Sequence, residues 1–157
     1  MKKFLKPIIS IFSFVLLLVL DLVTKTIFEA KNITLIKGVF SIFSTHNTGA
    51  GFSIFSNQTT FLLIITSVFL VLFTLFLVFE KDKKTNLWWI SIALIYSGAI
   101  GNMIDRLMFG YVRDFLFFEL INFPIFNVAD VCLTVGIVLF AINFLFLQLK
   151  LNKGGEK

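Results

Sequence analysis

The sequence has little of what a soluble enzyme normally carries. It has one cysteine and one histidine among 157 residues, which excludes an internal disulfide and the common zinc sites. Only 15% of its residues are charged, whereas soluble domains carry about 25%. Hydrophobic residues instead make up 58%, and the mean hydropathy is +0.97. This composition excludes an ordinary soluble enzyme and a disordered chain, and it indicates one membrane domain.

Long runs without charge predict four membrane spans. A helix needs about 20 predominantly apolar residues to cross the hydrocarbon core of a bilayer. Uncharged runs begin after Lys6, Lys37 and Lys84, and a fourth run carries a single charge, Asp130. We therefore expect an all-α membrane protein with a small β element, which forms a single four-helix domain over residues 1–157. The predicted spans lie near residues 8–28, 60–79, 87–105 and 126–147.

The first predicted span also has the length of a signal-peptide core, which would be removed from the mature protein. Lys2 and Lys3 precede the apolar stretch Pro7–Leu20, as in such a peptide. No cleavage site of the small-x-small kind follows, because the chain continues as Asp21–Lys25. We therefore expect this helix to be retained.

Lysines and arginines predict the orientation in the membrane. Most of them lie before the first span, between the second and third, and after the fourth. The positive-inside rule therefore places both termini in the cytoplasm. This topology explains the net charge of +5, and no basic patch interleaves with base-stacking aromatics, so we expect no nucleic-acid partner. Trp88 and Trp89 lie where interfacial aromatic anchors are common.

The segment over residues 29–59 is long enough to hold structure on the outer face of the membrane. Ile33–Ile36 and Val39–Ser44 are rich in β-branched and aromatic residues, and Lys37-Gly38 between them is typical of a turn. We therefore expect a small hairpin or sheet on the outer surface. The second outer segment, residues 107–124, is expected to join the third and fourth spans as a loop.

Polar side chains gather near the outer ends of three predicted spans. They recur three or four positions apart, so each set shares one helix face. An ionised group at the membrane centre costs about 2.5–3.5 kcal/mol, and such groups normally face the bundle interior or a wet cavity. This polar layer is therefore a candidate functional site. The three sets are Asp21 and Lys25; Asn102, Asp105 and Arg106; and Asn127, Asp130 and Thr134.

Carboxylates are the best catalytic candidates in this layer. Asp114 and Asp130 flank one loop, and two neighbouring carboxylates share a proton. Such a pair suits peptide hydrolysis, because one carboxylate activates water while the other, protonated, polarises the carbonyl group. The residues alone leave other roles open for either aspartate, namely a helix cap or a salt bridge to Arg106 or Arg113.

Other nucleophiles and bases have less support in the sequence. Cys132 is surrounded by apolar residues, which favours packing over catalysis. His46 is alone in a predicted loop, which favours a surface or hydrogen-bonding role. A dyad of Ser53 and Lys25 is conceivable, but nothing in the spacing supports it.

Five short motifs occur in the order found in one enzyme family. On these motifs the chain resembles lipoprotein signal peptidase (signal peptidase II), the bacterial inner-membrane aspartic protease. Leu22 stands where the family usually has Gln, and Ser97 where it often has Gly, but neither is a proposed catalytic residue. The motifs are Asp21–Lys25, Asn47–Ser53, Gly98–Arg106, Gly110–Phe115 and Phe126–Asp130.

The resemblance implies a fold and an activity. The expected fold has four transmembrane helices, with a small β-cradle and a mobile loop on the periplasmic or outer face. The expected reaction removes the signal peptide of a diacylglyceryl-modified prolipoprotein by cleavage before the lipidated cysteine, near the outer leaflet of the inner membrane. The family needs no metal or cofactor and is inhibited by the cyclic peptide globomycin. We expect a monomer whose partners are this substrate and membrane lipid.

The resemblance also implies roles for individual residues. Asp114 and Asp130 correspond to the catalytic pair. The residues expected to line or support the substrate cleft are Asn47, Gly49, Asn102, Arg106 and Asn127. The residues expected to brace the cleft are Asp21, Lys25 and Asp105.

A small proton-coupled transporter with the aspartates as a relay is the main alternative function. A proton relay crosses the membrane, whereas this polar layer occupies one end of the predicted bundle. Transporters also tend to show internal repeats, and none is evident here. A structural membrane protein without chemistry would leave the polar faces on three helices unexplained.

Overall fold

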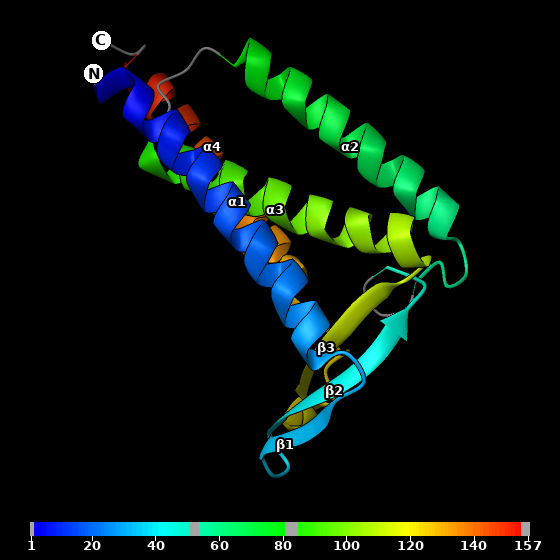
Figure 1. The fold of residues 1–157 in the computed structure, drawn as a ribbon. Helices are drawn as coiled ribbons and strands as arrows, with labels where there is room; N and C mark the ends of the chain where they lie inside the picture. Colours follow the sequence, from blue (N-terminus) through cyan, green and yellow to red (C-terminus); the bar gives the residue numbers. More distant parts are fainter. Residues whose placement is uncertain (1, 51–53, 81–84, 155–157) are drawn as a thin grey trace.

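The computed structural model describes residues 2–50, 54–80 and 85–154. In this part of the chain, four helices are long and apolar enough to cross a membrane, which confirms the expected helical fold. The beginning of the first helix and the end of the last lie at the same end of the bundle (Figure 1). The helices are α1 (Lys2–Phe28), α2 (Thr59–Phe79), α3 (Asn86–Phe109) and α4 (Val128–Gly154).

Helix α3 is the central element of the bundle. Half of its apolar stretch is buried inside the protein, against 11%, 6% and 17% for α1, α2 and α4. Glycines allow the neighbouring helices to approach it closely. A Cβ atom at Gly98 would lie 2.3 Å from the carbonyl oxygen of Ala129, and one at Gly101 would lie 2.5 Å from Asp21 Oδ2. Helices α4 and α1 therefore pack directly against the backbone of α3.

A three-stranded antiparallel sheet lies at the other end of the bundle (Figure 1). Its order is β1 (Asn32–Ile36), β2 (Phe40–Asn47) and β3 (Val112–Phe118). The expected hairpin is confirmed as β1 and β2, with Gly38 in the left-handed region (φ 71°) at the turn. This conformation favours glycine, because glycine has no Cβ atom.

Strand β3 corrects the expectation that residues 107–124 form a loop. Helix α3 ends at Gly110, whose left-handed conformation (φ 80°) reverses the chain, and whose N–H donates to the carbonyl oxygen of Arg106. The following residues are rich in β-branched and aromatic side chains and pair with the free edge of β2. This composition is a local sign of a strand, but the partner strand β2 is far away in the sequence, so the pairing itself could not be predicted from the segment.

The register between β2 and β3 places Asn47 and Asp114 near each other. Thr45 lies opposite Asp114, and Asn47 lies opposite Val112. Asp114 therefore projects from a hydrogen-bonded strand beside the end of β2. A strand holds a side chain in a more fixed direction than a loop does, because its backbone is tied to its neighbours.

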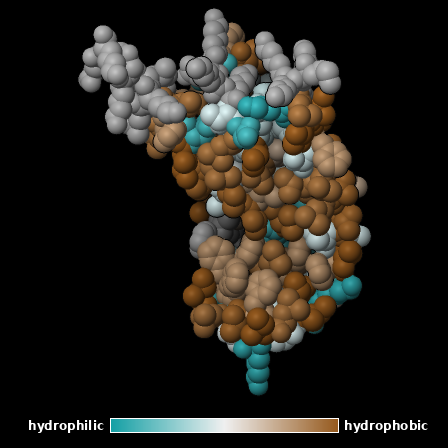
Figure 2. Space-filling view, turned by 90° about the vertical axis from the view of Figure 1, so that its left-hand side faces the viewer, coloured by the Kyte–Doolittle hydropathy of each residue, from teal (hydrophilic) through white to brown (hydrophobic). Residues whose placement is uncertain are grey.

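Aromatic side chains fill the bundle end remote from the sheet. Trp88 is only 1% exposed, and its ring centroid lies 6.5 Å from that of Phe76 and 5.1 Å from that of Phe140. The expectation of an interfacial anchor is therefore wrong for Trp88, because α2 and α4 cover it. The outer surface of the helices is mostly hydrophobic, as the brown face in Figure 2 shows.

Candidate active site

Asn127 and Asp130 form the beginning of α4. Asn127 directly precedes the helix, and its Oδ1 accepts a hydrogen bond from the backbone N–H of Asp130 (2.9 Å). Asp130 Oδ2 accepts one in return from the backbone N–H of Asn127 (3.0 Å). This reciprocal pair is the arrangement of a capping box, which satisfies N–H groups that the first helical turn leaves free. Helix capping therefore fixes the position of the Asp130 carboxylate.

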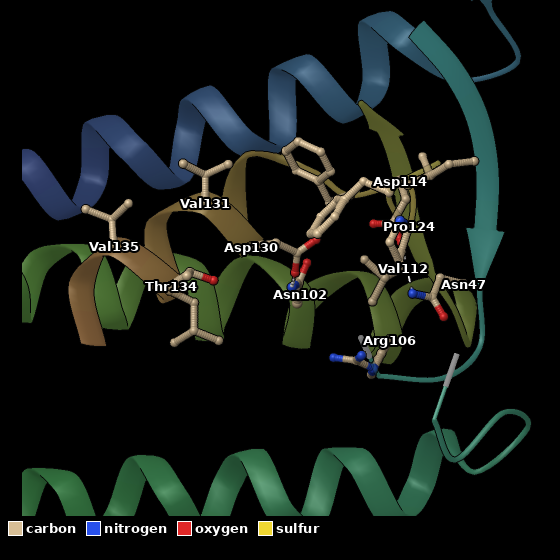
Figure 3. Close-up of a pocket in the computed structure, with 14 residues that line it drawn as sticks. Asn47, Asn102, Arg106, Val112, Asp114, Pro124, Asp130, Val131, Thr134 and Val135 are labelled. Atoms are coloured by element: carbon tan, nitrogen blue, oxygen red, sulfur yellow. Dashed lines mark hydrogen bonds between the residues drawn. The ribbon is translucent and has the colours of Figure 1, made fainter. Parts of the chain in front are cut away.

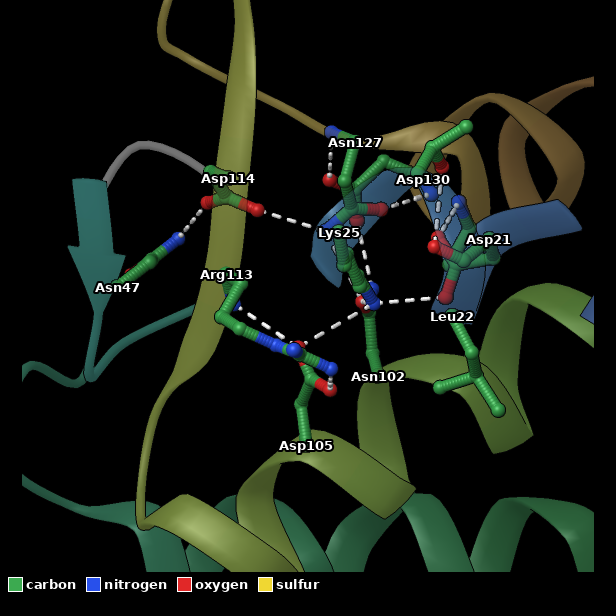
Figure 4. A network of polar contacts seen from close by, with 12 residues as sticks. Asp21, Leu22, Lys25, Asn47, Asn102, Asp105, Arg113, Asp114, Asn127 and Asp130 are labelled. Atoms are coloured by element: carbon green, nitrogen blue, oxygen red, sulfur yellow. Dashed lines mark hydrogen bonds and ion pairs between the residues drawn. The ribbon is translucent and has the colours of Figure 1, made fainter. Parts of the chain in front are cut away.

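Asp114 reaches the same point from β3. Its Oδ1 accepts a hydrogen bond from Asn127 Nδ2 (2.6 Å), and its Oδ2 accepts one from Asn47 Nδ2 (3.0 Å). Asn127 thus donates to both carboxylates, with its side-chain amide to Asp114 and its backbone N–H to Asp130 (Figure 4). The structure therefore brings the two predicted aspartates together around one buried asparagine.

Asn102 connects Asp130 to a group of buried charges. Its Nδ2 donates to Asp130 Oδ1 (2.7 Å), and its Oδ1 accepts from Asn127 Nδ2 (3.1 Å) and Lys25 Nζ (2.9 Å). A lysine ammonium only donates hydrogen bonds, so it must face the amide oxygen. Lys25 therefore holds Asn102 in the orientation that directs its N–H toward Asp130.

The buried charges behind Asn102 are paired. Lys25 Nζ lies 2.8 Å from Asp21 Oδ2 and 3.6 Å from Asp105 Oδ2, and all three side chains are at most 1% exposed. Asp105 Oδ1 lies 2.8 Å from Arg113 Nη2. Buried charges need such partners, because removal of one leaves another charge without compensation. The residues predicted to brace the cleft thus form one connected network (Figure 4).

The two arginines do not form the salt bridges that the sequence left open for Asp114 and Asp130. Arg113 bonds Asp105 through its backbone N–H (3.0 Å) and its guanidinium group. Arg106 Nη2 donates to the carbonyl oxygen of Gly49 (2.8 Å). Arg113 is held by Asp105 because the turn at the end of α3 places the two residues beside each other.

A cavity of about 410 Å³ opens beside the two aspartates. Figure 3 shows its polar end and, beyond Asp130, an apolar end along α4. Five of the ten predicted site residues line it, whereas Gly49, Asn127 and the bracing residues do not. The five that line it are Asn47, Asn102, Arg106, Asp114 and Asp130. This cavity has the size and mixed lining of a ligand site.

The electrostatics of the cavity favour a shared proton. Burial, and secondarily the neighbouring charge of Asp130, raise the pKa of Asp114 to about 7, although hydrogen bonds from Asn47 and Asn127 oppose the shift. Desolvation disfavours a charged carboxylate, and a second carboxylate nearby disfavours it further. A pKa in this range suits a group that acts as a general acid or base at neutral pH.

The other candidates lie elsewhere or outside the described residues. Cys132 is buried, which agrees with packing. His46 belongs to β2 rather than to a loop, and its ring stacks on Tyr111 with centroids 3.9 Å apart. Ser53 and its neighbours 51–52 lie outside the described residues. Within the described ranges, no group of three or more His, Cys, Asp or Glu side chains is arranged to hold a metal ion.

Two contributors to the network were not predicted as site residues. Arg113 binds Asp105 across a helix–strand boundary, which no helical spacing reveals. The backbone N–H of Ala129 donates to Asp21 Oδ1 (2.8 Å). The rule that the first N–H groups of a helix need partners could have indicated an acceptor near Ala129, but not that Asp21 supplies it.

Comparisons with known proteins agree on one group of membrane enzymes. A sequence model described as signal peptidase (SPase) II matches residues 13–146. The lipoprotein signal peptidase of Clostridium tetani is 41% identical over 136 residues, which cover 82% of this chain and 86% of that protein. The corresponding protein of Staphylococcus carnosus is 39% identical over 154 residues, which cover 93% and 96%. A solved structure described as a bacterial membrane enzyme has a TM-score of 0.79 at 34% identity and 87% coverage of both chains.

Proposed function

The chain belongs to the signal peptidase II family, and from this premise we propose that Asp114 and Asp130 hydrolyse the substrate with one activated water molecule. The protein is a signal peptidase that removes signal peptides from prolipoproteins, as the family and its similar relatives indicate. The same similarities do not favour a proton-coupled transporter. The single observation that carries the two-aspartate mechanism is the placement of both carboxylates around Asn127, at the wall of one cavity.

The proposed mechanism gives the two carboxylates different roles. Asp114, with its raised pKa, carries the shared proton and donates it in a hydrogen bond to the scissile carbonyl oxygen. In this proposal Asp130 acts as the base that takes a proton from water, while the N–H groups of Asn127 and Asn102 that donate to its two oxygens hold it in place. The resulting hydroxide attacks the carbonyl carbon, and Asp114 stabilises the oxyanion of the tetrahedral intermediate. Asp130 then gives the proton that it took from water to the leaving nitrogen, and the C–N bond of the tetrahedral intermediate breaks.

The remaining predicted residues have positioning roles in this proposal. Asn47 and Asn127 hold Asp114, while Asn102 holds Asp130. Arg106 lines the cavity and ties Gly49 to its rim. The bracing residues Asp21, Lys25 and Asp105 act through Asn102 and through the backbone of α4.

The proposed substrate determines where the enzyme works. This multi-pass bacterial membrane protein lies in the inner membrane, with both termini cytoplasmic and the sheet on the outer face. The diacylglyceryl chains of the substrate stay in the outer leaflet, which places the scissile bond before the lipidated cysteine near that interface. The site at the sheet end of the bundle suits this depth. The enzyme acts as a monomer in contact with membrane lipid, and globomycin inhibits it.

The test uses purified enzyme in detergent with two forms of one prolipoprotein, with and without the diacylglyceryl group. We expect the wild type to cleave the lipidated form alone, before the modified cysteine, and globomycin to block this cleavage. Asp114→Asn and Asp130→Asn should each lower kcat by about 1,000-fold, within the range for loss of general acid–base catalysis. Both variants should keep the gel-filtration profile of the wild type.

Glu80→Gln is the matched control, because this carboxylate follows α2 at the end of the bundle remote from the cavity. It should leave activity unchanged. Cleavage by either folded asparagine variant at near wild-type rate would reject the two-aspartate mechanism. Equal cleavage of the unlipidated form would reject the proposed substrate.

A further inference from the structure

The cavity continues beyond the catalytic pair toward the middle of the bundle. Its extension follows α4, where Val131, Leu133, Thr134 and Val135 line it after Asp130. A helix rises about 1.5 Å per residue, so this extension is about 7 Å long. An extended peptide advances about 3.3 Å per residue, so roughly two substrate residues fit along it. The signal peptide leaves the catalytic pair in this direction, because its apolar part lies in the membrane.

Thr134 is the only polar side chain among these described residues of the extension. Its side chain is exposed to the cavity, and Figure 3 shows its hydroxyl directed toward the side of Asp130. It lies one helical turn deeper than Asp130, on the same face of α4. Its hydroxyl is therefore placed to meet a peptide that passes from the catalytic pair into the membrane.

Thr134 differs from other threonines of the membrane helices in its hydrogen bonding. Each of the four comparison threonines donates its hydroxyl to the carbonyl oxygen four residues earlier, at 2.6 to 2.8 Å. In the described structure the Thr134 hydroxyl has no such bond and no other hydrogen-bond partner. It is thus an available donor and acceptor in an otherwise apolar wall. The comparison threonines are Thr24, Thr26, Thr66 and Thr74.

We propose that Thr134 binds the unwound backbone of the signal peptide, at the first or second residue before the scissile bond. A peptide bond must leave the helical conformation to enter the catalytic pair, which frees N–H and C=O groups of the substrate. Such groups are strongly unfavourable in an apolar environment unless they find a hydrogen-bond partner. Asparagines and Arg106 offer partners at the polar end, and Thr134 offers one in the extension. This inference rests on the proposed function and adds a substrate-binding residue to it.

The test compares Thr134→Val with Thr134→Ser on the lipidated prolipoprotein. Valine keeps the shape and removes the hydroxyl, whereas serine keeps the hydroxyl. We expect Thr134→Val to lower kcat/KM by about 3- to 10-fold, mainly through a higher KM, as the loss of one hydrogen bond predicts. Thr134→Ser should stay within about twofold of wild type. Thr66→Val is the matched control, because the Thr66 hydroxyl bonds within its own helix, and it should leave activity unchanged.

A substrate-side experiment separates binding from a structural role. Two synthetic lipidated substrates carry an ester in place of the first or the second peptide bond before the scissile one. One ester should lower kcat/KM for the wild type, and this loss should disappear in Thr134→Val, because the same hydrogen bond cannot be lost twice. A role in helix packing would give no such coupling.

Several results would overturn the inference. Wild-type kinetics for Thr134→Val would do so, as would equal defects in the serine and valine variants, or additive effects of ester and valine. These outcomes leave the proposed function intact as long as the wild type cleaves and Asp114→Asn does not. A wild type that leaves the lipidated prolipoprotein uncut would instead reject the proposed function, and this inference with it.

Discussion

The two ends of the helix bundle are held together by different kinds of contact. Near the sheet, Lys25, Asn102 and Asp130 are joined by hydrogen bonds of 2.7 to 2.9 Å, each with a defined donor and acceptor. At the other end, the rings of Trp88 and Phe140 pack at a centroid distance of 5.1 Å. Hydrogen bonds depend on direction, whereas apolar contacts tolerate exchange of similar volumes. The end near the sheet therefore fixes the geometry of the polar network, whereas the aromatic end mainly contributes to stability.

Lys25→Met should give the largest loss of stability, because it removes the cation that joins Asp21, Asp105 and Asn102. Asp21 and Asp105 lose a buried partner, and Asn102 loses the group that orients it. Loss of one member of a buried pair costs about 3–5 kcal/mol, and we expect a stability loss of that size. Activity should fall by about 100-fold or more, since misorientation of a catalytic group is costly. Thermal unfolding and kcat/KM on the lipidated substrate measure the two effects.

Lys37→Met is the control for this prediction, because it removes a lysine from the exposed hairpin turn. Lys37→Met should change neither the thermal unfolding nor kcat/KM appreciably. Retention of at least a tenth of wild-type activity by Lys25→Met would show that the network does not orient the catalytic pair.

A pair of glycine substitutions compares the polar network with an apolar contact between α3 and α4. The added Cβ at Gly101 would meet Asp21 Oδ2 at 2.5 Å, and the one at Gly136 would meet Ile95 at 2.9 Å. Both variants overpack, which costs about 1–3 kcal/mol. Only Gly101→Ala displaces a carboxylate of the network, so it alone should also lose about tenfold in kcat, roughly the effect of a small misplacement. Equal activity of the two variants in the same assay would contradict the comparison.

The next smaller effect is the dependence of kcat/KM and of stability on pH. Asp114 must keep its proton in the proposed mechanism, so kcat/KM should fall as the pH rises through about 7. The folded pKa of about 7 exceeds the unfolded value of 3.8, so the folded state holds more protons between these values. Stability should therefore fall as the pH rises through this window and level off above it. The melting temperature should fall less over this pH range for Asp114→Asn than for the wild type. Activity that is flat between about pH 6 and 8 would argue against Asp114 as the acid.

Phe140→Leu should have the smallest effect on activity. The substitution keeps an apolar side chain in contact with Trp88, so the cost is about 1 to 1.5 kcal/mol, typical of a tolerated core exchange. Activity at a temperature well below unfolding should stay within about twofold of wild type. A tenfold loss without unfolding would show that the aromatic end also controls the geometry of the site.

The sequence predicted the helices and the polar layer because both depend on local patterns. Uncharged length identifies a span, and spacings of three or four residues identify a shared helix face. Asp21 and Lys25 are such a pair, and the structure joins them by an ion pair. The hairpin of β1 and β2 was predictable for the same reason, since its two strands and its turn are contiguous.

The parts that escaped prediction depend on which segments meet in space. Val112–Phe118 becomes a strand because the edge of β2 is available to it. Trp88 is buried because Phe76 and Phe140 from two other helices cover it. Arg113 pairs with Asp105 because the turn at Gly110 brings them together. None of these contacts leaves a periodic mark in the sequence.

The capping of α4 by Asn127 determines how the site responds to heating. The hydrogen bonds that begin this helix are the ones that hold Asp130, and the same asparagine holds Asp114. Helix ends are where fraying starts, well before a protein unfolds as a whole. Fraying of this one turn would separate the two aspartates of the proposed mechanism while the bundle stays folded. We therefore expect activity to be lost below the temperature at which the bundle unfolds, together with a rise in amide hydrogen exchange at the start of α4.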